Sequence, residues 1–64
     1  MRMEIKLNLD NETFRDDLGE LNRQEIGLIL GHLIGRIVEG HNNIILSDSN
    51  GNSVGEFWII PDND

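Results

Sequence analysis

Hydrophobic and polar residues alternate strictly over residues 3–9 (MEIKLNL). A period of two places every second side chain on the same side of an extended chain, so this pattern predicts a strand with one buried face. Residues 43–48 (NIILSD) and 53–60 (SVGEFWII) are short apolar runs bounded by polar residues, and they predict two further strands. Between them, Asn50-Gly51 is typical of a two-residue type I′ hairpin turn, in which both residues have positive φ.

A type I′ turn also fixes how the two hairpin strands pair. It places Ile44 opposite Phe57 and Leu46 opposite Gly55. The outer face of the hairpin then carries Ile45, Val54, Trp58 and Ile60, and the face toward the core carries Ile44, Leu46, Phe57 and Ile59. A tryptophan among isoleucines on an outer sheet face indicates a second contact or a platform for a ligand. The alternative is a partly exposed apolar patch that the acidic tail, residues 61–64, covers.

Residues 23–39 repeat apolar side chains at helical spacing and predict a helix. Asn22 is suited to the N-cap position, and the side chain of Glu25 can bond back to it. Gly40 is a favourable stop, because glycine adopts the left-handed conformation that commonly ends a helix.

The segment before this helix, residues 10–21, has no periodicity and is rich in Asp, Glu and Asn. We expect an ordered acidic loop that Phe14 and Leu18 anchor to the rest of the chain. The element order is then β-α-β-β. This order predicts a single small α+β domain over residues 1–64, with one helix packed on a three-stranded sheet.

The predicted helix has two apolar faces, although a small sheet can cover only one. The stripe suited to the core consists of Ile26, Ile29, Leu30, Leu33 and Ile37. The other face carries three glycines at a spacing of four residues with apolar neighbours: Gly27, Leu28, Gly31, Ile34, Gly35 and Val38. Glycines at this spacing let two helix backbones approach closely, so this face predicts the interface of a homodimer or higher oligomer. The alternative is that the glycines admit a neighbouring loop, namely residues 10–21.

Composition narrows the classes of partner. The 64 residues include no cysteine, so disulfides and thiolate metal sites are excluded. The formal net charge of −7 and pI of about 4.5 disfavour binding to DNA or RNA, because the phosphate backbone repels an acidic chain. No signal peptide is visible, and the longest apolar segment is too short to span a bilayer. We therefore expect a cytoplasmic protein without a membrane partner.

Few residues are suited to catalysis or metal binding. Neither the acidic loop nor the segment Asp48–Asn52 has the ligand spacing of a calcium-binding loop, so we interpret their polar residues as turn and capping residues. His32 and His41 are not placed beside a nucleophile. The sequence predicts a non-enzymatic protein with no cofactor and no metal.

Two arginines are candidates for binding an anion. Arg23 lies at the start of the predicted helix, where free backbone N–H groups also favour anions. Arg36 projects beside the glycine-bearing face, so two copies in a dimer could frame a symmetric pocket. Together with Trp58, these two are the candidate ligand-binding residues. The alternative is that both arginines pair with surplus surface carboxylates.

The layout resembles a group of very short proteins encoded by tailed bacteriophages and prophages. The matching elements are the strand Met3–Asp10, Phe14-Arg15-Asp16, the helix through Gly40, and Asp48-Ser49-Asn50-Gly51-Asn52-Ser53-Val54-Gly55-Glu56-Phe57. The glycine-spaced helix and Trp58 depart from that layout. The resemblance implies a phage-type accessory protein. Several tiny phage proteins act against host defence, either by sequestering nucleotide-derived immune signals or by plugging a host protein.

From the two apolar faces, the arginines and this resemblance, we expect a non-enzymatic homo-oligomer that acts in counter-defence. It would capture a small, nucleotide-like signal at its subunit interfaces, in the cytoplasm of the host cell. The alternative is an acidic protein that blocks a basic site on a host protein.

Overall fold

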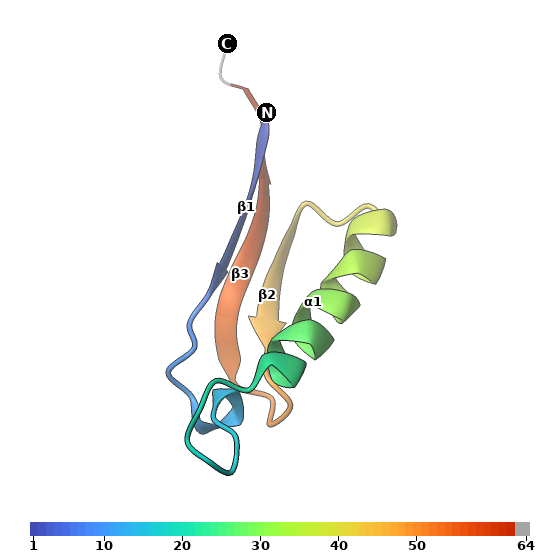
Figure 1. The fold of residues 1–64 in the computed structure, drawn as a ribbon. Helices are drawn as coiled ribbons and strands as arrows, with labels where there is room; N and C mark the ends of the chain where they lie inside the picture. The colour runs from blue at the N-terminus through green and yellow to red at the C-terminus, as the bar shows by residue number, and fades with distance from the viewer. Residues whose placement is uncertain (63–64) are drawn as a thin grey trace.

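The computed structural model describes residues 1–62 and contains one helix packed beside a three-stranded antiparallel sheet (Figure 1). Its elements, in chain order, are β1 (Arg2–Leu7), a short 3₁₀ helix η1 (Glu12–Phe14), α1 (Arg23–Val38), β2 (Asn43–Ser47) and β3 (Ser53–Ile60). This arrangement confirms the predicted α+β class. Of the expected acidic tail, Asn63 and Asp64 lie outside the described residues.

The strand order in the sheet is β1-β3-β2, so the last strand of the chain lies in the middle. β3 pairs with both neighbours in the antiparallel direction. Ile44 lies opposite Phe57 and Leu46 lies opposite Gly55, as the sequence predicts. A Cβ atom at Gly55 would overlap the backbone carbonyl oxygen of Lys6, so β1 approaches β3 too closely there for any other residue.

The predicted type I′ turn is wrong. Gly51 has a φ of 83°, but no residue other than glycine has positive φ among the described residues, so Asn50 does not fit a type I′ turn. The carboxylate of Asp48 accepts hydrogen bonds from the backbone N–H groups of Asn50 and Asn52, and this holds a longer loop instead.

The longer loop shifts the pairing between Leu46 and Ser47, which is a β-bulge. Beyond the bulge Ser47 lies opposite Ser53, and Val54 turns inward. The prediction that Val54 lies on the outer face is therefore wrong, since its side chain is only 5% exposed and belongs to the core.

The core joins the loop, the helix and the hairpin. Its buried apolar side chains are Phe14, Ile29, Leu33, Leu46, Val54 and Phe57. Phe14 of η1 is fully buried and anchors the acidic loop, as expected. Leu18 is 84% exposed, so the prediction that it is a second anchor is wrong.

Both ends of α1 are capped. At the N-terminus Asn22 Oδ1 accepts from the backbone N–H of Glu25 at 3.3 Å, as the sequence predicts. At the C-terminus Gly40 has a φ of 103°, its N–H donates to the carbonyl of Ile37, and the N–H of His41 donates to the carbonyl of Arg36. This pair of bonds is the Schellman motif, which explains why the helix stops at a glycine.

α1 lies alongside β2 and leaves much of β1 uncovered (Figure 1). β1 and the end of β3 extend beyond β2 as a two-stranded ribbon (Figure 1). As a result, Met3 is 55% exposed and Ile5 is 41% exposed, although their strand face was predicted to be buried. The radius of gyration is 13.3 Å, whereas a compact chain of this length would have about 11 Å.

Candidate functional site

The glycine-bearing face of α1 is open in the structure. Three of its apolar side chains are well exposed: Leu28 at 52%, Ile34 at 63% and Val38 at 82%. A Cβ atom added at any of the three glycines, Gly27, Gly31 or Gly35, would meet no other atom within 4 Å. The acidic loop therefore does not pack against them, which excludes the alternative that the glycines admit residues 10–21.

Another flank of α1 faces β2. His32 and Arg36 line a groove together with β2. At 3.6 residues per turn, Ile34 lies about 160° around the helix from His32. The flank with Ile34 and Val38 is thus directed away from the groove between α1 and β2.

The groove between α1 and β2 has a volume of about 190 Å³. It is lined by about two turns of the helix and by four consecutive strand residues: Ile29, His32, Leu33, Arg36, Ile44, Ile45, Leu46 and Ser47. Arg36 supplies a permanent positive charge and several N–H donors, and His32 supplies an imidazole. This combination is suited to an anionic group such as a phosphate or a carboxylate.

Sequence reasoning did not place His32 in this groove. The signal was present, because His32 and Arg36 are four residues apart and therefore lie on the same side of a helix. That both residues line one groove depends on the position of β2 beside that side of α1, which only the structure shows.

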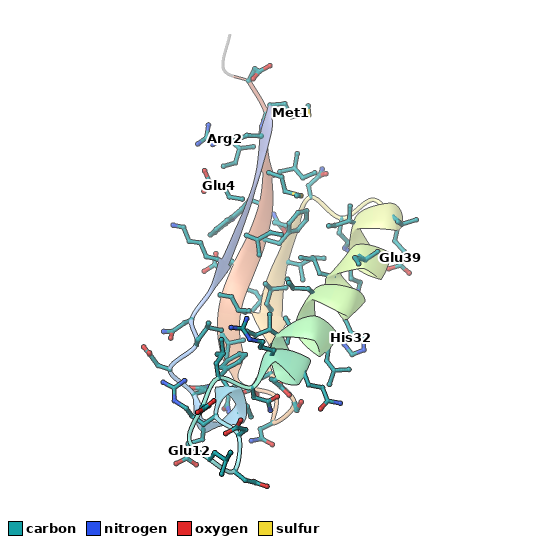
Figure 2. All side chains as sticks on the ribbon, in the orientation of Figure 1. Met1, Arg2, Glu4, Glu12, His32 and Glu39 are labelled. Atoms are coloured by element: carbon teal, nitrogen blue, oxygen red, sulfur yellow. The ribbon has the colours of Figure 1, made fainter. Side chains whose placement is uncertain are left out.

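The three candidate ligand-binding residues do not come together within one chain. Arg23 is the first residue of α1 and Arg36 lies thirteen residues later, which corresponds to about 20 Å along the axis. Trp58 lies opposite Glu4 of β1, and the side chain of Glu4 points away from α1 (Figure 2). Residues directly opposite in a sheet share a face, so Trp58 is on the outer face.

The ring of Trp58 is already occupied. The Nζ atom of Lys6 lies 5.7 Å from the ring centroid, within the range of a cation–π interaction. Trp58, Lys6 and Glu56 contribute to a shallow hollow of about 260 Å³ on this face. A planar ligand that stacked on Trp58 would first have to displace Lys6.

Asp48 joins the acidic loop to the hairpin. Its Oδ2 atom accepts from Asn11 Nδ2 at 3.1 Å and from Thr13 Oγ1 at 2.9 Å. Burial by itself raises the pKa of the Asp48 carboxyl, but the hydrogen bonds from Asn52, Asn11 and Thr13 outweigh burial and lower the pKa to about 2. Asp48 is therefore a structural residue that is charged at neutral pH, in agreement with its interpretation as a turn residue.

Glu25 is a second buried carboxylate with a structural role. It is 6% exposed and accepts from the backbone N–H and the hydroxyl of Ser49, at 2.8 Å and 2.6 Å. The Glu25 side chain therefore ties α1 to the hairpin loop. The predicted bond from this side chain back to Asn22 is wrong, because the backbone N–H of Asn22 donates to the carbonyl of Phe14 instead.

Among residues 1–62, no three His, Cys, Asp or Glu side chains lie close enough together to hold a metal ion. In the same part of the chain, no helix has the length and apolar character needed to cross a membrane. Comparison of the chain with models of known protein families, with curated proteins and with solved structures finds no match.

Proposed function

We propose that this chain is a small non-enzymatic binding protein that works as a homo-oligomer, with the glycine-bearing face of α1 as a subunit contact. The observation that carries the proposal is this apolar helix face, on which Leu28, Ile34 and Val38 are more than half exposed. Exposed apolar surface of this kind on a small domain typically marks a contact with another molecule. The open space at the three glycines allows a second backbone to approach.

The ligand we propose is a small phosphate-bearing molecule of the nucleotide class, bound in the groove between α1 and β2. Arg36 and His32 provide the groups that recognise the phosphate. The groove volume of about 190 Å³ is below the roughly 300–1,000 Å³ of typical ligand pockets. The groove therefore holds the phosphate, and the rest of a nucleotide extends beyond it. The resemblance to phage accessory proteins suggests sequestration of a host immune signal, in the cytoplasm of the host, as the purpose.

The subunit contact is tested by light scattering and by the variant Gly31→Leu. We expect the wild type to have the mass of a dimer or more, compared with 7.3 kDa for one chain. Leucine at position 31 has room in the protomer but blocks backbone approach, so we expect the variant to lose this contact while it stays folded. The control is Asp17→Leu, an exposed substitution in the acidic loop, outside α1. A wild-type monomer at all concentrations would refute the contact.

The ligand is tested separately by titration calorimetry with cyclic nucleotides and ADP-ribose derivatives. We expect binding at micromolar concentration, a loss of at least tenfold in affinity for Arg36→Gln, and no change for Arg23→Gln. Absence of binding to every member of the panel would reject the ligand and leave the subunit contact standing.

A second candidate is an acidic inhibitor of a basic protein, and the ordered acidic loop favours it. Asp16 Oδ1 accepts from the backbone N–H groups of Leu18 and Glu20, so the loop holds its exposed carboxylates on a fixed backbone. This candidate predicts a salt-sensitive complex with a basic partner that is lost when Asp17 and Glu20 are reversed to lysine. Asp16 is kept native in that test, because its side chain shapes the loop.

A further inference from the structure

The outer edge of β1 has backbone groups that are free to pair. β1 is an edge strand of the described sheet, because it pairs with β3 on one side and with no strand on the other. The N–H of Asn8, just after the strand, donates to the carbonyl of Val54 at 2.7 Å. Backbone groups alternate along a strand, so the even-numbered residues bond toward β3 and the N–H and C=O groups of Met3, Ile5 and Leu7 point to the free edge.

This edge lacks two of the features that prevent edge-to-edge pairing, namely a proline and a β-bulge, although it carries charged side chains. The strand Arg2–Leu7 contains no proline and its register with β3 is regular. Its side chains toward α1 are apolar, and two of them, Met3 and Ile5, are exposed because α1 lies beside β2. A free edge beside exposed apolar side chains is a surface suited to pairing with another strand.

We propose that β1 pairs antiparallel with β1 of a second copy of this chain, with the symmetry axis at Ile5. In this register Ile5 lies opposite the partner's Ile5, and Met3 lies opposite the partner's Leu7. Glu4 lies opposite the partner's Lys6, so each interface contains two pairs of opposite charge. Both kinds of cross-strand pair are favourable.

The charges along the strand disfavour a register in which the symmetry axis lies at Glu4. An axis at Glu4 would place Glu4 opposite the partner's Glu4 and Arg2 opposite the partner's Lys6, which are like charges. An axis at Met3 opposes unlike charges, but it pairs fewer residues of the strand Arg2–Leu7. Only the axis at Ile5 combines a long overlap with complementary charge.

The positions of the free backbone N–H and C=O groups agree with the same register. The free N–H and C=O groups belong to Met3, Ile5 and Leu7, and these are the residues that face one another across an axis at Ile5. Each of the three pairs then exchanges two backbone hydrogen bonds. The product is a continuous six-stranded sheet, with both copies of α1 on one face.

This contact is independent of the glycine-face contact. α1 lies beside β2, and each β2 is separated from the paired edge by β3 and β1, with strands about 4.8 Å apart. The two helices of a strand-paired dimer are therefore too far apart for their backbones to touch. A chain that makes both contacts would form a closed tetramer or an extended assembly.

The first test is amide hydrogen exchange of the full chain at increasing concentration, followed by NMR. We expect the amides of Met3, Ile5 and Leu7 to exchange at least tenfold more slowly at high concentration. Glu4 and Lys6 are bonded to β3 and serve as internal references that change little. Equal exchange of Met3, Ile5 and Leu7 at all concentrations would overturn the proposal. Gly31→Leu should not alter this protection, which separates the result from that of the helix contact.

The second test uses proline on each free edge of the sheet. Ile5→Pro removes an N–H that points away from β3, so the protomer tolerates it, but strand pairing is blocked. Ile45→Pro is the matched control on β2, the other edge strand. The N–H of Ile59 donates to the carbonyl of Asn42, so the even-numbered residues of β2 bond toward β3. The N–H of Ile45 therefore points to a free edge. We expect only Ile5→Pro to abolish the concentration-dependent protection of Met3 and Leu7. The same effect from both variants would contradict the proposal.

The third test exchanges charges across the axis. Glu4→Lys and Lys6→Glu each create two like-charge pairs, so we expect each to lower the association constant measured by sedimentation by about tenfold. The double variant restores opposite charges and should restore association. If the double variant is as weak as the single variants, the register is wrong. Circular dichroism checks that each variant is folded.

Discussion

At the scale of single residues, the structure depends on two buried carboxylates that connect segments far apart in the sequence. Asp48 joins the hairpin to Asn11 and Thr13 of the acidic loop, and Glu25 joins α1 to Ser49. Each accepts several hydrogen bonds, which is the condition under which a buried charge is tolerated. No buried side-chain nitrogen or oxygen among the described residues lacks a partner.

The lowered pKa of Asp48 predicts how stability depends on pH. Folding lowers the pKa from its usual 3.8 to about 2, so the folded state binds this proton less tightly than the unfolded state. The resulting stabilisation is complete above a pH of about 3.8 and is lost as the pH falls through about 2. In urea unfolding, we expect Asp48→Asn to be less stable than the wild type at pH 7, with a difference that shrinks toward pH 2. Asp17→Asn, with the same change of charge at an exposed position, is the control and should show no such trend.

At the scale of elements, α1 contains glycines that serve different purposes. Gly40 has a φ of 103° and ends the helix, so the protomer requires it. Gly27, Gly31 and Gly35 lie inside the helix, where each costs about 1 kcal/mol relative to alanine. The protomer gains nothing from them, because the space beside each is empty.

This difference predicts opposite effects of alanine at the two kinds of position. Under conditions in which the protein is monomeric, we expect Gly27→Ala and Gly35→Ala each to raise the free energy of unfolding by up to about 1 kcal/mol. Gly40→Ala should lower it by about 1–2 kcal/mol, because alanine is strained at positive φ. Urea unfolding measures both. A destabilising Gly35→Ala would mean that the glycine face has a role within the protomer.

At the scale of the whole molecule, several large apolar side chains stay exposed to solvent. Among the large side chains of residues 1–62, only Phe14 and Phe57 are fully buried, and a domain of this size has a small core. Three apolar side chains of α1 and two of β1 remain open to solvent. Association would bury them, and it is a common way for a short chain without disulfides to become stable.

The thermal midpoint should therefore depend on protein concentration. Association stabilises only the folded chain, so the midpoint of wild-type unfolding should rise when the concentration is raised a hundredfold. Scanning calorimetry or circular dichroism measures this rise. We expect Gly31→Leu or Ile5→Pro each to reduce it and the two together to abolish it. A midpoint independent of concentration would indicate that the protomer is stable alone.

The candidate site was predictable only in part. The glycines, Leu28, Ile34 and Val38 share one helical face by spacing alone, and the structure leaves that face open. The meeting of His32 and Arg36 with β2 was not predictable, because it depends on which side of α1 the strand occupies. The exposure of Met3 and Ile5 was not predictable either, because alternation shows that a strand has an apolar face but not what covers it.

The sequence by itself determined the α+β class and the ends of α1 at Asn22 and Gly40, because these follow from local periodicity and backbone preference. Only the tertiary structure decided the hairpin loop, because Asp48 is held by Asn11 and Thr13 of the acidic loop. Its further bonds to Asn50 and Asn52 override the turn preference of Asn50-Gly51, and Val54 turns inward. It also decided which apolar faces stay open, because burial depends on how far one short helix reaches across three strands of unequal length.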